Sequence, residues 1–251
     1  MLTNIWKDFK KSLGQKYTYM YFIGIILLIV IANTAVVGFR LFYGANEGTY
    51  AYNLLEYATW CFFIPYYTCI FIADIGLGKN YQELKNNNDG TTRTRNYLTK
   101  LIVSFLLGLL FLIVAALMLI GITSIFQAGD GGLRWYSVKD FLNKMCIALP
   151  LWYAGVSFGV MFLFICSKKK WAFIGYAITT IIIPRIIMIF AAEPFKVGIL
   201  RTIRTYTITQ NFSLIPYPAD PARNVTLTIV VGLLYGTIAT IIGIIIYNRK
   251  K

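Results

Sequence analysis

The chain has 251 residues, of which 58% are hydrophobic and 14% charged, and its mean hydropathy is +0.65. Soluble domains average roughly 45–50% apolar and about 25% charged residues, so this composition excludes an ordinary soluble enzyme and a disordered tail. The net charge of +14 is spread between apolar runs, which favours a role in membrane orientation over nucleic-acid binding. Histidine is absent and the four cysteines form no CxxC pair, so we predict no metal site.

Residues 1–18 precede the first apolar run and are amphipathic. Apolar residues recur at spacings of three and four, with Trp6 and Phe9 among them, and lysines such as Lys10 fill the other faces. This pattern predicts a short helix that lies in the cytosolic membrane interface, with Trp6 at the boundary. The alternative is a basic start that only orients the chain.

Six apolar runs follow, and each is long enough for a membrane-spanning helix of about 20 residues. They cover about residues 19–39, 57–75, 101–126, 146–166, 171–191 and 227–247. Helices are expected because lipid offers no partner to an unpaired backbone group. The sequence therefore predicts an all-α membrane protein with a single transmembrane domain over residues 1–251. Pro65 and Pro184 are expected to kink their spans.

Lysine and arginine are distributed unequally between the two sides of these spans. Fifteen lie in the two termini and in the second and fourth connections, and eight lie in the remaining connections. The positive-inside rule then places both termini in the cytosol, which agrees with an even number of spans.

The second connection, residues 76–100, is the only sizeable cytosolic one. Gly76 and Gly78 interrupt the preceding span, residues 79–85 can form two helical turns, and Asn86–Gly90 favours a turn that stops them. A short helix held between two spans is a suitable lever, because force applied to it by a soluble partner would tilt both spans. An ordinary solvated loop is the alternative.

The longest external connection, residues 192–226, contains a semi-apolar stretch over 197–214 that is expected to fold back against the outer membrane face. Arg185 lies within the fifth span, where a charge costs at least about 2.5–3.5 kcal/mol, so it should face protein or water. Its expected partner is Glu193 or a carboxylate of another span. Arg185 therefore either lines a transport path or makes a structural ion pair.

Aromatic residues crowd the second span, and Trp60, Phe63 and Tyr67 are candidates for an apolar wall of a transport path. Interhelical packing or an interfacial belt would explain them equally. Two Gly-x-x-x-Gly pairs, at 155–159 and 232–236, allow close helix approach within one subunit or across a dimer. The tripeptides that begin at Asn211 and Asn224 match glycosylation acceptors by chance.

The second connection and both ends of the chain resemble type-2 ABC exporter permeases. Gly78, Leu84, Arg93 or Arg95, Tyr97 and Lys100 are similar to the segment between the second and third spans of that family. The last span, Gly232–Lys251, ends in a basic cluster as in the family, and the amphipathic start is a further common feature. The chain departs from the family in its acidic element, since only Asp74 precedes the glycines.

The resemblance implies that Lys79–Asp89 is a coupling helix seated in a groove of an ATPase subunit. The residues expected to make this contact are Lys79, Tyr81, Glu83, Leu84, Lys85 and Asp89. It also implies an interfacial elbow at the N-terminus, re-entrant external helices over Glu193–Arg223, and two permeases, identical or homologous, paired with two ATPases. ATP and Mg²⁺ would bind to those partners, because residues 76–80 lack the leading Gly and the Ser/Thr of a P-loop.

The leading hypothesis is a permease subunit, without catalytic residues or a cofactor of its own, that exports hydrophobic or amphipathic peptides across a bacterial plasma membrane. Drugs, lipid-linked glycans and ions are alternative cargoes. A six-span scaffold or sensor that transports nothing is the alternative from another class. A membrane-embedded enzyme is disfavoured because histidine is absent and few acidic residues reach membrane depth.

Overall fold

The computed structural model describes residues 2–43, 50–78, 90–126, 133–192, 195, 197–216 and 221–249, and the regular structure within these ranges is helical. Five helices are long and apolar enough to cross a membrane: α2 (Lys16–Tyr43), α6 (Gly90–Phe126), α7 (Trp135–Ile165), the continuous α8–η2–α9 (Lys169–Ala191) and α12 (Pro221–Arg249). A bent pair, α3 (Tyr50–Trp60) and α4 (Phe63–Leu77), would be a sixth crossing. The chain thus has the architecture of a multi-pass helical membrane protein.

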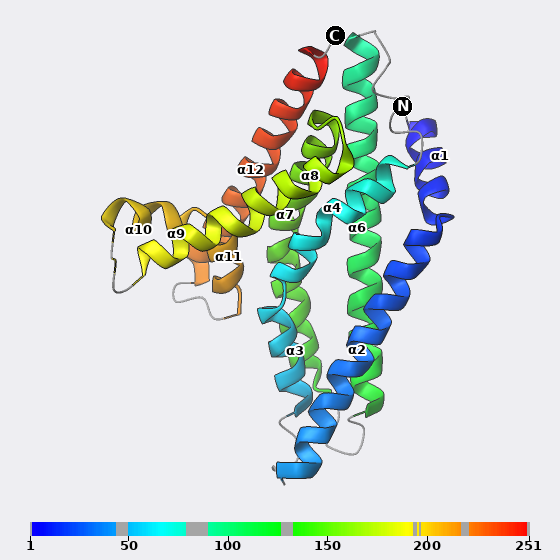
Figure 1. Ribbon diagram of the computed structural model, residues 1–251. Coiled ribbons are helices and arrows are strands. Elements are labelled where there is room, and N and C mark those ends of the chain that lie inside the picture. The colour runs from blue at the N-terminus through cyan, green and yellow to red at the C-terminus, as the bar shows by residue number, and fades with distance from the viewer. Residues whose placement is uncertain are drawn as a thin grey trace.

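Helix α7 forms the centre of the molecule. In its most apolar stretch 67% of the residues are buried, against 17–28% in the other four long helices. Helices α12 and α4 pack along α7, and α6 packs on α4 and α7 (Figure 1). The start of α1 (Leu2–Leu13) and the end of α12 lie at the same end of the bundle, as an even number of crossings requires (Figure 1).

Three of the long helices extend well beyond the apolar runs. Helix α6 begins 11 residues before the predicted start at 101, α7 begins 11 residues before 146, and α12 begins six residues before 227. The apolar pattern marks only the part of a helix that suits lipid, whereas polar turns continue the helix wherever they find partners. In the first turns of α7, Lys144 pairs with Asp140 across one helical turn at 2.7 Å.

The second predicted span, 57–75, is bent, as expected for a span that contains Pro65. Helices α3 and α4 meet at an angle of 60° across Cys61 and Phe62. Pro65 explains the position of the bend, because a proline ring clashes with the carbonyl group four residues earlier, here that of Cys61. At Pro184 the helix remains continuous, since a π-helical turn at Ile178–Ile182 directly precedes the proline.

Both Gly-x-x-x-Gly pairs serve packing within this chain. A Cβ atom on Gly155 would lie 2.7 Å from the Tyr66 ring, and one on Gly159 would lie 3.1 Å from Ala73, so this pair brings α7 against α4. A Cβ on Gly232 would lie 2.4 Å from the backbone of α7. The absence of side chains at these positions lets the helix backbones approach closely.

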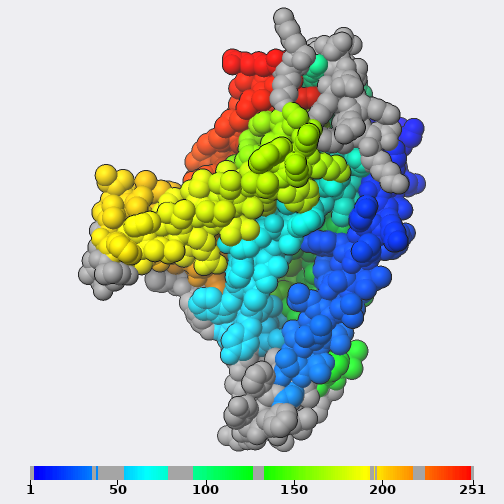
Figure 2. Space-filling model, viewed as in Figure 1, coloured from blue at the N-terminus to red at the C-terminus, as the bar shows by residue number. Residues whose placement is uncertain are grey.

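The stretch 197–214 forms two short helices, α10 (Gly198–Thr205), which packs on α9, and α11 (Ile208–Leu214), which packs on α12 and α7. Helix α9 (Ile183–Ala191) and α10 project sideways from the body, in yellow and gold in Figures 1 and 2. Asn211 of α11 is fully buried: its Nδ2 donates to the carbonyls of Thr205 and Thr207, and its Oδ1 accepts from Thr228 of α12 at 3.2 Å. Burial of this amide agrees with a chance glycosylation match.

Candidate functional site

The candidate coupling region begins where α4 ends. Gly78 caps α4 with a φ of +75°, a left-handed conformation that favours glycine, and its N–H donates to the Asp74 carbonyl at 3.2 Å. Helix α6 starts at Gly90. The six predicted ATPase contacts, Lys79 to Asp89, lie outside the described residues, as does Glu193. The structure defines the end of α4 and the start of α6 on either side of this segment. We call these two helix ends, with the polar contacts that hold them, the frame.

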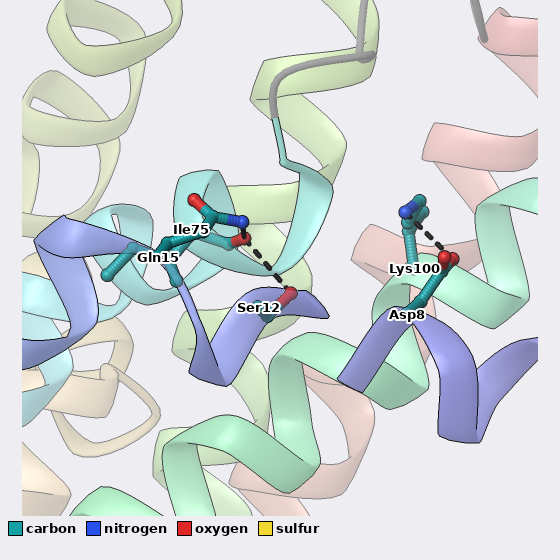
Figure 3. Close-up of polar contacts among 5 residues, drawn as sticks. All are labelled: Asp8, Ser12, Gln15, Ile75 and Lys100. Atoms are coloured by element: carbon teal, nitrogen blue, oxygen red, sulfur yellow. Dashed lines mark hydrogen bonds and ion pairs between the residues drawn. The ribbon is translucent and has the colours of Figure 1, made fainter. Parts of the chain in front are cut away.

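The amphipathic N-terminal helix α1 is fastened to this frame (Figure 3). Ser12 Oγ and Gln15 Nε2 both donate to the Ile75 carbonyl near the end of α4, at 3.3 and 3.1 Å. Asp8 forms an ion pair with Lys100 of α6 at 2.8 Å. Because the Lys100 side chain is only 11% exposed, solvent screens this pair less than an ordinary surface ion pair. Helix α1 therefore bridges α4 and α6 on either side of the coupling region.

The aromatic residues of α1 divide between two surroundings. Phe9 packs against the buried group formed by Ile72, Ile75 and Leu107. Trp6 is 58% exposed and stacks on Phe9, with Lys10 Nζ 5.1 Å from the Trp6 ring centre. One face of α1 thus binds the bundle while Trp6 remains outside.

Helices α8 (Lys169–Ala177) and α12 join the same frame. Lys169 at the start of α8 pairs with Asp74 of α4 at 2.6 Å. Asn248 Nδ2 of α12 donates to Thr94 Oγ1 of α6 at 2.9 Å, and Arg93 lies over the Tyr247 ring at 5.7 Å. The polar contacts therefore link five helices at one end of the molecule.

Four of the residues that carry the family resemblance lie at the end of α4 and the start of α6, whereas Leu84 lies outside the described residues. Gly78 is the cap of α4, and Arg93, Tyr97 and Lys100 occupy the first turns of α6. Tyr97 is fully buried against Phe164 of α7, with ring centres 5.0 Å apart. These side chains thus fix the start of α6 against its neighbours.

The predicted transport-path residues do not form one group. Phe63 and Tyr67 are partly buried, with ring centres 5.4 Å apart, and both pack against the core around α7 and α11. Trp60 is 45% exposed at the end of α3. Arg185 is exposed on α9, which packs chiefly on α10 and η2 rather than on α3 or α4. The aromatic residues therefore surround the helix bend, and Arg185 is separate from them.

Sequence reasoning missed the two residues that hold the bend. Trp152 Nε1 of α7 donates to the Phe62 carbonyl at 2.9 Å, and the Tyr176 hydroxyl of α8 donates to the Tyr66 carbonyl. Both carbonyls also belong to the hydrogen-bond ladder of α4, so these are additional bonds that tie α7 and α8 to α4 next to the bend. The sequence signal that could have indicated these contacts was the presence of two aromatic hydrogen-bond donors, Trp152 and Tyr176, within spans, together with Pro65 in another span.

None of the known protein-family models matches this sequence, and a search of the curated proteins returns no match. The fold by itself defines the class, a helical multi-pass membrane protein. At one end of the molecule, the frame holds the helices on either side of residues 79–89.

Proposed function

We propose that this chain is the transmembrane permease subunit of an ATP-driven exporter of the type-2 ABC class. In this proposal a partner ATPase binds residues 79–89 on the cytosolic side and moves the helix bundle from there. The single observation that supports it best is the frame: both ends of residues 79–89 continue into helices that are tied to α1 and α8.

The contacts of the frame suit the transmission of a displacement. The end of α4 is held by Ser12 of α1, by Gln15 in the link between α1 and α2, and by Lys169 of α8, and the start of α6 is held by Asp8. Exposed ion pairs contribute about 0–1 kcal/mol and neutral hydrogen bonds about 0.5–1.5 kcal/mol. The contacts together stabilise the frame by a few kcal/mol, which is enough for α1, α4, α6 and α8 to move as a unit.

The proposed cargo is a hydrophobic or amphipathic peptide. The aromatic residues around the bend, Trp60, Phe63 and Tyr67, offer apolar surface and no cluster of charges. A second permease, the same or a homologous chain, would complete the path. In the proposed bacterial plasma membrane, both termini would lie in the cytosol. Drugs, lipid-linked glycans and ions remain the alternative cargoes.

Co-purification tests the proposal. The full chain with an affinity tag is isolated from native membranes in mild detergent, and ATP hydrolysis of the preparation is measured. We expect a separate chain with ATPase activity to co-purify. Replacement of residues 79–89 by a Gly/Ser linker of equal length should remove that partner, whereas the same replacement of residues 127–132 should retain it.

Two outcomes would contradict the proposal. If the parent chain isolates no ATP-hydrolysing partner, the scaffold or sensor hypothesis is favoured. If the partner remains bound after replacement of residues 79–89, an ATPase is present but does not grip this segment, and the coupling mechanism is wrong.

A further inference from the structure

An apolar cavity of about 550 Å³ lies between α2, the bent pair α3–α4, α6 and α7. Its volume falls within the roughly 300–1,000 Å³ typical of small-molecule sites. The cavity is separate from the polar frame, and none of the residues that line it is charged. The following inference does not depend on the proposed transport function.

Three polar side chains in the cavity wall, those of Tyr21, Thr68 and Trp152, already have hydrogen-bond partners. The hydroxyl groups of Tyr21 and Thr68 are hydrogen-bonded at 2.8 Å, and Thr68 Oγ1 also donates to the Pro65 carbonyl at 3.1 Å. Trp152 Nε1 is engaged by the Phe62 carbonyl. A ligand that brought amide or hydroxyl groups into this space would leave them unpaired, at a cost of about 1–3 kcal/mol each. The wall therefore selects hydrocarbon.

The cavity opens sideways between α2 and α3–α4. Its rim is formed by Met20 and Leu28 of α2 and by Tyr57 and Ile64 of the bent pair, which are 40–62% exposed. Its floor includes Trp152 of α7, which is 3% exposed. Helix α2 packs mainly along α6, and it shares one face of the molecule with α3–α4, in blue and cyan in Figure 2. A bilayer around these helices would present acyl chains to this opening.

The cavity is long. Along α2 its lining runs from Met20 to Ala32, a rise of about 18 Å at 1.5 Å per residue. One leaflet is about 15 Å deep, half of a hydrocarbon core of about 30 Å. The lining therefore extends over about the depth that a single acyl chain of a bilayer lipid occupies.

We propose that this cavity is a binding site for a single acyl chain of a bilayer lipid, which enters between α2 and α4 and leaves its head group outside. The Tyr21–Thr68 hydrogen bond joins α2 to α4 beside the opening and keeps the cavity from widening there. The occupied site fills the space around the bend at Cys61 and Phe62, so lipid binding stabilises the bent form of α3–α4.

Fluorescence quenching of Trp152 tests the site. Trp6, Trp60, Trp135 and Trp171 are each replaced by phenylalanine in the full chain, which is reconstituted in phosphatidylcholine vesicles whose acyl chains carry bromine at mid-chain. We expect emission from Trp152 to fall by at least half relative to unbrominated vesicles, although the side chain is buried. Gly24→Leu, which places a side chain in open space at the cavity wall, should reduce this quenching several-fold.

Gly121→Leu is the matched control, because a Cβ at Gly121 also meets open space but does not line the cavity. It should leave the quenching unchanged. The proposal is overturned if Trp152 is not quenched in the parent, or if Gly24→Leu and Gly121→Leu quench alike.

A second measurement needs no variant at the cavity. A phosphatidylcholine with a photoreactive diazirine on its acyl chain should label the α7 peptide that contains Met145, Leu149 and Trp152. Labelling confined to the exposed faces of the outer helices would equally refute the site.

Discussion

Replacement of Trp152 by phenylalanine should destabilise the bent helix by an amount that the structure allows us to work out. The variant keeps an aromatic ring against Phe62, whose ring centre lies 5.3 Å away, but removes the Nε1–H that donates to the Phe62 carbonyl. The Phe62 carbonyl is the N-cap carbonyl of α4 and keeps its helical hydrogen bond, so the variant loses one further buried hydrogen bond, which contributes about 0.5–1.5 kcal/mol. For a chain of this size each kcal/mol lowers the melting temperature by roughly 2–4 °C, so we expect a decrease of roughly 1–6 °C.

Thermal unfolding of the full chain in detergent measures this effect. It is followed by the circular dichroism of the helical backbone, so that the loss of a tryptophan does not alter the signal used. Trp135→Phe is the matched control, since Trp135 is 74% exposed and the same atoms are removed from a solvent- or lipid-facing position. The control should change the melting temperature by less than about 2 °C, because surface substitutions stay within about 0.5 kcal/mol. Equal melting temperatures for the two variants would show that the hydrogen bond does not hold the bend.

Three further predictions concern the packing and the frame. Gly232→Ala should lower the melting temperature severely, because the new Cβ would lie 2.4 Å from the α7 backbone. Gly121→Ala, the control, should be neutral or stabilising by about 0.5–1 kcal/mol. Thermal unfolding compares the two variants, and similar melting temperatures would contradict the close approach of Gly232 to α7. A double-mutant cycle with Asp8→Asn and Lys100→Gln should give a coupling energy of about 1 kcal/mol that decreases in high salt, and strictly additive effects would argue against the ion pair. Asn211→Ala should cost about 1–3 kcal/mol, because it removes the side-chain donor to the Thr205 carbonyl and the acceptor of the buried Thr228 hydroxyl group, and chemical denaturation that finds no loss would refute this role.

The frame and the acyl-chain site lie on different parts of the same bent helix. The end of α4 carries Asp74 and Ile75 of the frame, and the bend at Cys61 and Phe62 forms part of the cavity wall. Movement of the frame would therefore change the shape of the cavity. This connection would let the membrane influence the frame, and it can be measured by repeating the Trp152 quenching with the proposed ATPase partner present.

The amphipathic start and the apolar runs were determined by the sequence alone. Leu2–Leu13 is a helix, and the five long helices cover their predicted apolar runs to within one residue, because these features follow from the local spacing of side chains and from the length that lipid requires. The family resemblance, the orientation and the contacts at Lys79–Asp89 stay predictions, because they concern partners and residues outside the described ranges.

The tertiary structure alone decided where the chain bends and what holds it there. Pro65 indicated a kink, but its 60° bend depends on Trp152 and Tyr176, which are about 90 and 110 residues away in the sequence. The ion pair between Asp8 and Lys100 and the close approach of Gly232 to α7 also join residues that are far apart in the sequence. Hydropathy records how a residue interacts with its solvent, whereas these contacts depend on which helices meet and at what height, and that is fixed only when the whole bundle packs.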